Sequence, residues 1–313
     1  MLNFIVRRIA TGIVMLFAVS LVAYFFLYLG MGNVARLILG NTATEADVMA
    51  KNHELGIDQP FFVQYFRWIS GAIHGDLGMA WSTPQNVSDA LGPRLSVTLT
   101  IVLLTTIVAA LLAIILGTLA AVFGGWIDRV VQVIGLVGFA VPGFLIAFTL
   151  ITLFAVKLHL FNAVGYVQPT DNFGEWMRSI TLPVIALSLS GIASVAQQVR
   201  GSVKDALNMD YVRTLRSRGH SFSRVIMKNV LRNAGGPALS ILGVQFVGMM
   251  GGAVIVEQIF AIPGIGPFTV QATNVSDVPA VMGVVIVTAL IVIVVNLIID
   301  LLSAALNPKV RLA

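Results

Sequence analysis

The sequence predicts an all-α integral membrane protein that crosses the bilayer six times. Of its 313 residues, 58% are apolar and only 11% are charged, whereas a soluble domain of this length carries about a quarter charged residues. The apolar residues also fall into long runs that lack Asp, Glu, Lys and Arg, and a membrane-spanning helix needs about 20 such residues. The folded chain is therefore expected to face lipid.

Six uncharged runs are long enough to span. They are 9–35, 95–127, 130–156, 179–199, 233–256 and 278–299. A charged residue at the centre of a span costs about 2.5 kcal/mol or more, so charge-free runs of this length are informative. A seventh run, 258–276, holds two prolines and two glycines within five positions, a cluster that breaks a helix. We expect 259–268 to form an apolar loop at the membrane surface.

Charge sets the orientation of these spans. With both termini on the inner side, the inner segments hold 13 of the 19 basic residues and four of the 14 acidic residues. Basic residues are enriched on the cytosolic side of membrane proteins, so both termini are predicted to be cytoplasmic. Most of the net positive charge lies in one segment between two spans, which suits membrane orientation better than binding to nucleic acid.

The expected organisation has three parts. Residues 1–94 comprise the first span and an outer aqueous loop, 36–94, that is long enough to fold. Residues 95–303 form a core of five spans that includes the main cytosolic segment, 200–232. Residues 304–313 form a cytoplasmic tail.

Several kinds of chemistry are absent from the sequence. There is no cysteine, no G-x-x-x-x-G-K-[ST] phosphate loop and no H-E-x-x-H motif, and the four histidines lie far apart. No catalytic cluster or metal site is expected, nor ATP binding by this chain. The span centres also lack the ionisable residues that ion-coupled carriers use. Glu257 and Asp300 lie at span ends, where we expect water or headgroups to solvate them.

The cytosolic segment 200–232 reads as two short helices joined by a turn. Asp210 is expected to cap the first helix, 211–218, and Gly219 to end it in a left-handed conformation. Helical spacing puts Tyr211, Val212 and Leu215 on one side, with Arg213 and Arg216 facing away.

The second helix of this segment is expected to begin at Ser221 or Ser223. Its apolar face would hold Val225, Ile226, Val230 and Leu231, and Gly235-Gly236-Pro237 would mark the start of the fifth span. Two interpretations of the segment remain open at this point. Its apolar stripe fills a groove on a partner protein, or the helix lies on anionic headgroups.

The amino-acid sequence of this segment resembles that of a known family. Asp210–Gly219, followed by Arg224-Val225-Ile226 and Leu231-Arg232-Asn233-Ala234, is similar to the cytoplasmic signature of ABC-importer permeases, and more narrowly to the B-type permease of dipeptide and oligopeptide importers. Arg213-Thr214 and Gly219 fit this branch, whereas Leu215 replaces its usual alanine.

The likeness extends over almost the whole chain. Further matching stretches are Leu55–Pro60, Gly75–Gly78, Val141–Phe144, Pro263–Gly266 and Asn307–Arg311. One departure is Gly30–Asn33, where the branch often reads Ala-Pro-Gly-Asp.

The resemblance implies a type I ABC importer permease fold and a role as half of a pathway for di- or oligopeptides in a bacterial or archaeal inner or plasma membrane. The implied partners are a homologous C-type permease, two cytosolic ATPase subunits that bind ATP and Mg, and an extracytoplasmic binding protein. Nickel, glutathione or another small solute is an alternative cargo. A self-sufficient carrier or channel is the alternative of another class.

The resemblance also implies which residues act. Those expected to couple to the ATPase are Asp210, Tyr211, Val212, Arg213, Thr214, Leu215, Arg216, Arg218 and Gly219. Polar candidates for lining the pathway are Gln197, Gln198, Gln245 and Asn296, and candidates for an outer gate are Glu257, Pro263, Gly264 and Gly266. Pro142 in the third span and the glycines of the fifth permit kinks or close helix packing.

Overall fold

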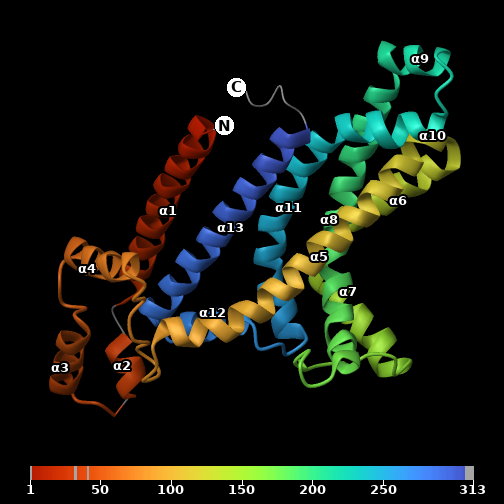
Figure 1. The fold of residues 1–313 in the computed structure, drawn as a ribbon. Helices are drawn as coiled ribbons and strands as arrows, with labels where there is room; N and C mark the ends of the chain where they lie inside the picture. The colour runs from red at the N-terminus through yellow and green to blue at the C-terminus, as the bar shows by residue number, and fades with distance from the viewer. Residues whose placement is uncertain (1, 32–33, 41, 307–313) are drawn as a thin grey trace. The chain divides into compact units, whose positions relative to one another are not determined.

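The computed structural model describes residues 2–31, 34–40 and 42–306. Over these ranges the chain is helical apart from loops and one isolated antiparallel bridge between Met79 and Asn86. The helices long and apolar enough to span are α1 (Leu2–Gly30), α5 (Val87–Phe123), α8 (Phe173–Leu207), α11 (Leu231–Ile259) and α13 (Val278–Leu306). The remaining expected span is broken into α6 (Gly125–Ala140) and α7 (Gly143–Leu150) (Figure 1). The described residues therefore provide five continuous candidate spans, and six if this bent pair crosses the bilayer as one.

The break in the third span is sharp. The two halves, Gly125–Ala140 and Gly143–Lys157, meet at an angle of 100°. Val141 is extended (φ −90°, ψ 119°), and Pro142, which has no N–H to donate, precedes the first residue of α7. Beyond α7 the helix continues as a π-helix, η2 (Ile151–Lys157). We expected Pro142 to allow a kink, and in the structure the two halves are nearly perpendicular to each other.

Two expectations about helix ends were wrong. Gly235-Gly236-Pro237 do not start a new helix, because α10 (Phe222–Val225), the π-helix η3 (Ile226–Val230) and α11 form one helical stretch that contains Pro237. Figure 1 shows the α10 end of this stretch lying at an angle to the body of α11. A proline inside a membrane helix is tolerated, since local 3₁₀ or π adjustments satisfy the freed backbone groups.

The expected loop 259–268 is also shorter than predicted. Non-helical backbone is limited to 260–264, and α12 (Ile265–Asn274) begins directly after it. Pro267 lies in the first turn of α12, where a missing N–H removes no helical hydrogen bond. The amide of Ile265 donates to Oγ1 of Thr98 (2.9 Å), which fixes the start of α12 against α5.

The chain divides into two compact units. One consists mainly of Val6–Thr98 and Pro263–Ile293, and the other mainly of Leu99–Ile262 and Val294–Ala313. In the first unit, α1 packs with α2 (Val34–Leu39), α3 (Glu45–Leu55) and α4 (Phe61–Ile73). Its buried core is Tyr24, Met31, Val34, Tyr65, Val278 and Met282.

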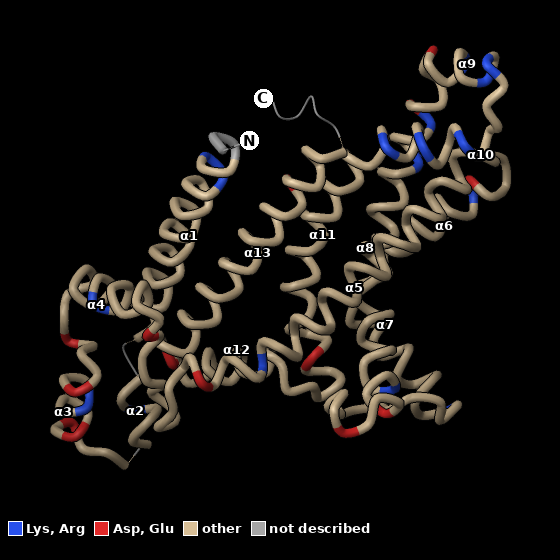
Figure 2. The backbone as a smooth tube through the Cα atoms, in the orientation of Figure 1, with Lys and Arg blue, Asp and Glu red and all other residues tan. Residues whose placement is uncertain are grey.

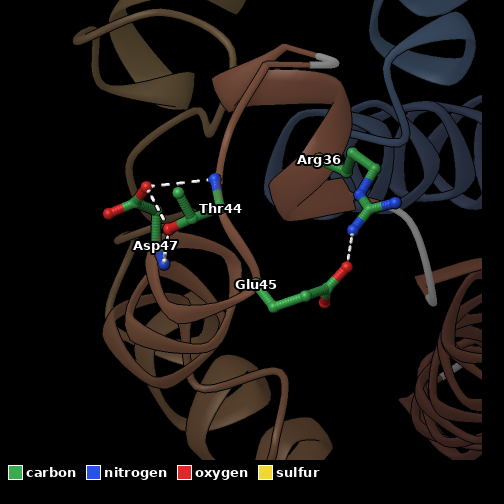
Figure 3. A network of polar contacts seen from close by, with 4 residues as sticks. All are labelled: Arg36, Thr44, Glu45 and Asp47. Atoms are coloured by element: carbon green, nitrogen blue, oxygen red, sulfur yellow. Dashed lines mark hydrogen bonds and ion pairs between the residues drawn. The ribbon is translucent and has the colours of Figure 1, made fainter.

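The segment that follows α1 is folded, and its first connection is held by side chains. Arg36 of α2 pairs with Glu45 in the first turn of α3, and Thr44 caps α3 by accepting from the Asp47 amide (3.2 Å) (Figure 3). Asp47 in turn accepts from the Thr44 amide (3.1 Å), so the capping box is closed in both directions. The hydrogen bonds from Thr44 hold the pKa of the exposed Asp47 carboxyl below its usual range.

The second unit is built on contacts between α8 and the helices α6, α7 and α11. Small residues permit the closest approaches. A Cβ at Gly117 of α5 would lie 2.6 Å from the carbonyl oxygen of Ala196, and one at Gly191 of α8 would lie 2.2 Å from Cε of Met249. Such glycine contacts are the usual means of packing helices in lipid, where little hydrophobic force acts between helices.

Candidate coupling and translocation site

The candidate coupling helix is α9 (Asp210–Ser217), and its two ends differ in how they are capped. Met209 occupies the N-cap position, so the expectation that Asp210 caps the helix was wrong. Asp210 lies instead in the first turn, where its carboxylate still favours the positive end of the helix dipole. At the other end, Gly219 has φ +83°, as predicted from the sequence.

Backbone hydrogen bonds fix the turn after α9. The amide of His220 donates to the carbonyl of Leu215 (3.2 Å), and the amide of Gly219 donates to that of Arg216 (3.0 Å). This pair of bonds is the Schellman arrangement, which requires a left-handed residue that glycine adopts at little cost. The end of α9 is therefore a defined turn.

The apolar stripe of α9 faces the chain's own core. Val212 is buried, and Tyr211 and Leu215 are partly buried beside it. They pack in one cluster with residues of α10, η3 and α11, among them Val225, Val230 and Ala234. Nδ2 of Asn233 also donates to the Tyr211 hydroxyl (3.0 Å). The stripe that was expected to fill a partner's groove therefore packs, through Val212, against the apolar face of the following helical segment.

The surface that α9 and its C-cap leave exposed is polar, with three basic residues and one acidic residue. It consists of Asp210, Arg213, Thr214, Arg216, Ser217 and Arg218. Arg216 also lies over the ring of Phe222 in α10, 5.2 Å from its centroid, which joins the two helices across the turn. We name this set of six residues the basic face of α9.

Basic residues gather around α9 and α10 at one end of this unit (Figure 2). The end holds nine basic residues, which are Arg129, Arg200, Lys204, Arg213, Arg216, Arg218, Arg224, Lys228 and Arg232, and three acidic ones, Asp128, Asp205 and Asp210. One acidic residue has a structural role that the sequence did not reveal. Asp128 of α6 accepts from Arg200 (Nη2–Oδ2, 2.8 Å) and from Lys204 (2.9 Å), both of α8.

One feature of the sequence, the spacing of the two basic residues, is compatible with this cluster of Asp128, Arg200 and Lys204. Arg200 and Lys204 are four residues apart, so they share one face of α8 and can reach the same carboxylate. The carboxylate oxygens of Asp128 connect the first turn of α6 to the last two turns of α8, just before α9 begins.

A cavity of about 260 Å³ lies in the second unit where the third span is broken. Its lining includes Gly143 and Phe144 of α7, Ser190 of α8, and Gln245 and Gly248 of α11. Gln245 is thus placed on a cavity, as a lining residue should be. Since α7 begins at Gly143, the break at Pro142 puts the start of a helix on this cavity.

The structure does not bring the four polar candidates together. Gln197 lies against Gly135, with Nε2 2.7 Å from where a Cβ of that glycine would be, and so belongs to the contact between α6 and α8. Gln198 donates to Ser202 one turn along its own helix (3.1 Å). Asn296 is exposed on α13, with its oxygen close to Gly243 of α11.

The outer-gate candidates differ in exposure. Glu257 is fully buried, so the expectation of a solvated residue at a span end was wrong. The chain turns back directly after α11, where the amide of Ile262 donates to the carbonyl of Glu257 (2.8 Å). Pro263 is exposed, whereas Gly264 and Gly266 are buried.

No group of three or more His, Cys, Asp or Glu side chains that could hold a metal ion occurs among the residues that the structure describes. The segment Asn307–Arg311, which the resemblance includes, lies outside those residues.

Comparison with known proteins agrees with the membrane architecture. Residues 113–312 match the family described as binding-protein-dependent transport system inner membrane component, and residues 1–102 match the N-terminal family of such membrane components. The structure is similar to a solved structure of the MetNI methionine ABC transporter in an inward-facing conformation, with a TM-score of 0.54 and 13% identity over 69% of this chain and 96% of that one. That likeness concerns the fold.

Similar sequences extend over the full length of the chain. A putative peptide transport system permease protein of Brucella abortus is 35% identical over 98% of both chains. A probable peptide ABC transporter permease protein of Sinorhizobium fredii is 33% identical over 98% of this chain and 99% of its own. A glutathione transport system permease protein of Escherichia coli K12 is 33% identical over 99% of both. The chain therefore belongs to the family of binding-protein-dependent transport system inner membrane components and is a permease subunit of an ABC importer.

Proposed function

We propose that this permease forms half of a pathway for di- or oligopeptides and that it receives mechanical work through α9. Its partners in this proposal are a homologous second permease, two cytosolic ATPase subunits and an extracytoplasmic binding protein. The ATPase subunits bind ATP and Mg, and this chain has no catalytic role. The similar sequences named as peptide permeases support the choice of cargo.

The observation that carries the coupling role is the construction of α9. Its apolar side is fixed to the chain's own core through Val212, and its end is closed by the turn at Gly219. A push on such a helix is passed to α8 and α11 instead of being absorbed by local movement, which is what transmission between sites requires. Because the basic face of α9 is what remains exposed, we expect the ATPase to offer it acidic residues.

Charge within each unit supports an orientation with both termini cytoplasmic. In the second unit the end with α9 holds nine basic and three acidic residues, whereas Lys157 and Arg178 are the basic residues of the segments at the opposite end. In the first unit, Arg7 and Arg8 precede the apolar part of α1, whereas residues 31–94 after it hold six acidic and four basic residues. Both patterns support a cytosolic position for the basic side.

Reconstitution in proteoliposomes tests the proposal. The permease pair, the ATPase subunits and the binding protein are expected to take up a labelled tripeptide only when ATP is present, and this chain alone is expected to take up none. Uptake by the chain alone, without ATPase subunits, would show that it is a self-sufficient carrier or channel. Uptake of glutathione but not of peptide would overturn the cargo and leave the importer assembly intact.

A further inference from the structure

Helix α4 in the segment after α1 has two contrasting sides. Phe62, Phe66 and Ile73 are strongly exposed, at 65%, 56% and 76%, and the partly buried Ile69 lies between them. Their positions i, i+4, i+7 and i+11 share one face of an α-helix. We call these four residues the apolar stripe of α4. A stripe of large apolar side chains without a charge is unusual on a surface that meets water.

The other side of α4 meets polar groups. Arg67, Trp68 and Gly71 line a cleft of about 400 Å³ together with Glu54 and Asp76. These three residues of α4 lie on the side of the helix away from the apolar stripe. The helix therefore separates a cleft that holds charged side chains from an apolar surface, as a helix at a membrane boundary does.

Contacts with α1 give the depth of α4. The Tyr65 hydroxyl is 2.8 Å from Oγ of Ser20, and the rings of Phe61 and Tyr24 are 5.9 Å apart. Counted from Arg8, Ser20 and Tyr24 lie about 18 and 24 Å along the helix at 1.5 Å per residue. The hydrocarbon layer is about 30 Å thick, so both contacts fall within it if Arg8 marks one boundary. Figure 1 shows α4 lying across α1.

The turn before α4 is hydrogen-bonded without the help of water. Nε2 of Gln64 donates to the carbonyls of Ile57 (3.0 Å) and Gln59 (2.7 Å), and the Tyr24 hydroxyl donates to Oε1 of Gln64 (3.4 Å). Gln64 is itself buried. In lipid, backbone carbonyls must find partners within the protein, and this side chain provides them.

We propose that α4 is embedded in the outer leaflet of the bilayer, parallel to its plane, with the apolar stripe against lipid acyl chains. Lipid is the occupant because aromatic contacts join the stripe to the exposed apolar surface of α1. Phe25 contacts Phe61 (5.9 Å), Phe61 contacts Phe62 of the stripe (5.1 Å), and Phe26 is 66% exposed. The proposal replaces the sequence-based expectation that all of 36–94 is aqueous. Its assignment to the outer leaflet rests on the orientation in the proposed function, whereas the contact with lipid does not.

Single-cysteine labelling tests this placement, because the chain has no cysteine of its own. Phe66→Cys is compared with Met49→Cys, which lies in α3 with a similar exposure of 65%. Both variants are studied in the assembled importer in proteoliposomes. A membrane-impermeant maleimide is expected to label Cys at 66 at least tenfold more slowly than at 49. A bimane attached at 66, but not at 49, is expected to be quenched by doxyl-labelled phosphatidylcholine.

Every outcome bears on the proposal. Equally fast labelling at both positions would place the stripe in water and overturn it. Slow labelling without lipid quenching would show that another protein covers the stripe, which also overturns it. If Met49→Cys reacted only from the cytosolic side while the label at 66 was still quenched, the orientation would fail and the lipid contact would stand. Phe62→Cys provides the same measurement if Phe66→Cys does not assemble.

Discussion

Arg200 and Asp128 form an ion pair that joins the last part of α8 to the first turn of α6. Nη2 of Arg200 donates to Oδ2 of Asp128 at 2.8 Å, and Lys204, one turn further along α8, donates to the same oxygen at 2.9 Å. Both side-chain cations lie just before α9 on the chain. This cluster connects α6 to the helix that leads into α9.

Replacing Asp128 with Asn is expected to destabilise the permease. The amide keeps the size of the side chain but leaves two partly buried cations without a counter-charge. The loss should be about 1–2 kcal/mol, the range for a charged hydrogen bond at a partly exposed site. Thermal unfolding of the purified complex measures it. Asp205→Asn is the matched control, since Asp205 is exposed on the same part of α8. Equal unfolding temperatures for the two variants would contradict a structural role for Asp128.

Gly219→Ala is expected to weaken the coupling of ATP hydrolysis to uptake. Gly219 has φ +83°, a left-handed conformation that costs an alanine about 1 kcal/mol. The turn that closes α9 should therefore open more often, so that uptake falls while ATP hydrolysis continues. Uptake per ATP hydrolysed is the measurement. Gly201→Ala in α8 is the control, because its Cβ would meet nothing within 4 Å. Unchanged coupling in Gly219→Ala would count against transmission through this turn.

Charge reversal on the basic face of α9 is expected to detach the ATPase without unfolding the permease. Arg213 and Arg218 are exposed, so Arg213→Glu with Arg218→Glu removes no core contact. Like charges placed against an acidic partner surface lower affinity and association rate. Copurification of the ATPase subunits should drop, while Arg213→Lys with Arg218→Lys should retain it. Val212→Asp, in contrast, should reduce the thermal stability of the permease itself, because Val212 is buried. Full ATPase binding by the glutamate variant would exclude this surface.

The hypothesis that the cavity beside the break at Pro142 is part of the peptide pathway can be tested by filling the cavity with a larger side chain. Gly248 lines the cavity next to Gln245, and a Cβ there would meet nothing within 4 Å. Gly248→Phe is therefore expected to enter open space and block peptide uptake while the protein remains folded. Gly251→Phe on the same helix is the control, since that position is equally open and is not part of the cavity lining. Blockage by Gly251→Phe alone would place the pathway on another side of α11.

The capping box of α3 predicts a pH effect in the segment after α1. Hydrogen bonds from Thr44 lower the pKa of Asp47 in the folded state, so the ionised carboxylate favours the folded helix. Its contribution is present above the unfolded pKa, near pH 4, and is lost as the pH falls through the lower folded value. Proteolysis within α3 should therefore accelerate at acidic pH. Asp47→Asn should be cleaved faster at pH 7 and show a smaller change with pH. A pH profile identical to that of the unmodified chain would exclude the box as the cause.

Features that depend on neighbouring residues along the chain could be predicted. The uncharged runs, the helix end at Gly219 and the separation of Val212 from Arg213 on α9 all follow from local sequence, because helix period and left-handed backbone preference act over a few residues. Features that depend on distant partners were missed. Nothing near Asp128 in the sequence indicates that Arg200 and Lys204 will reach it, and the residues beside Glu257 do not indicate that its side chain will be buried.

The sequence by itself determined that the chain meets lipid, where its long uncharged helices lie and in which segments basic residues gather, because lipid excludes charge from any helix whatever its neighbours. Only the tertiary structure decided which face each amphipathic segment shows. The apolar side of α9 could have met a partner, but Val225 and Val230 cover it, so its basic face is exposed. The stripe on α4 could have been core, but Tyr65 and Gln64 turn the opposite side toward α1. The period of apolar residues along a helix defines which side of the helix is apolar, whereas tertiary packing decides whether that side contacts the protein core, a partner or lipid.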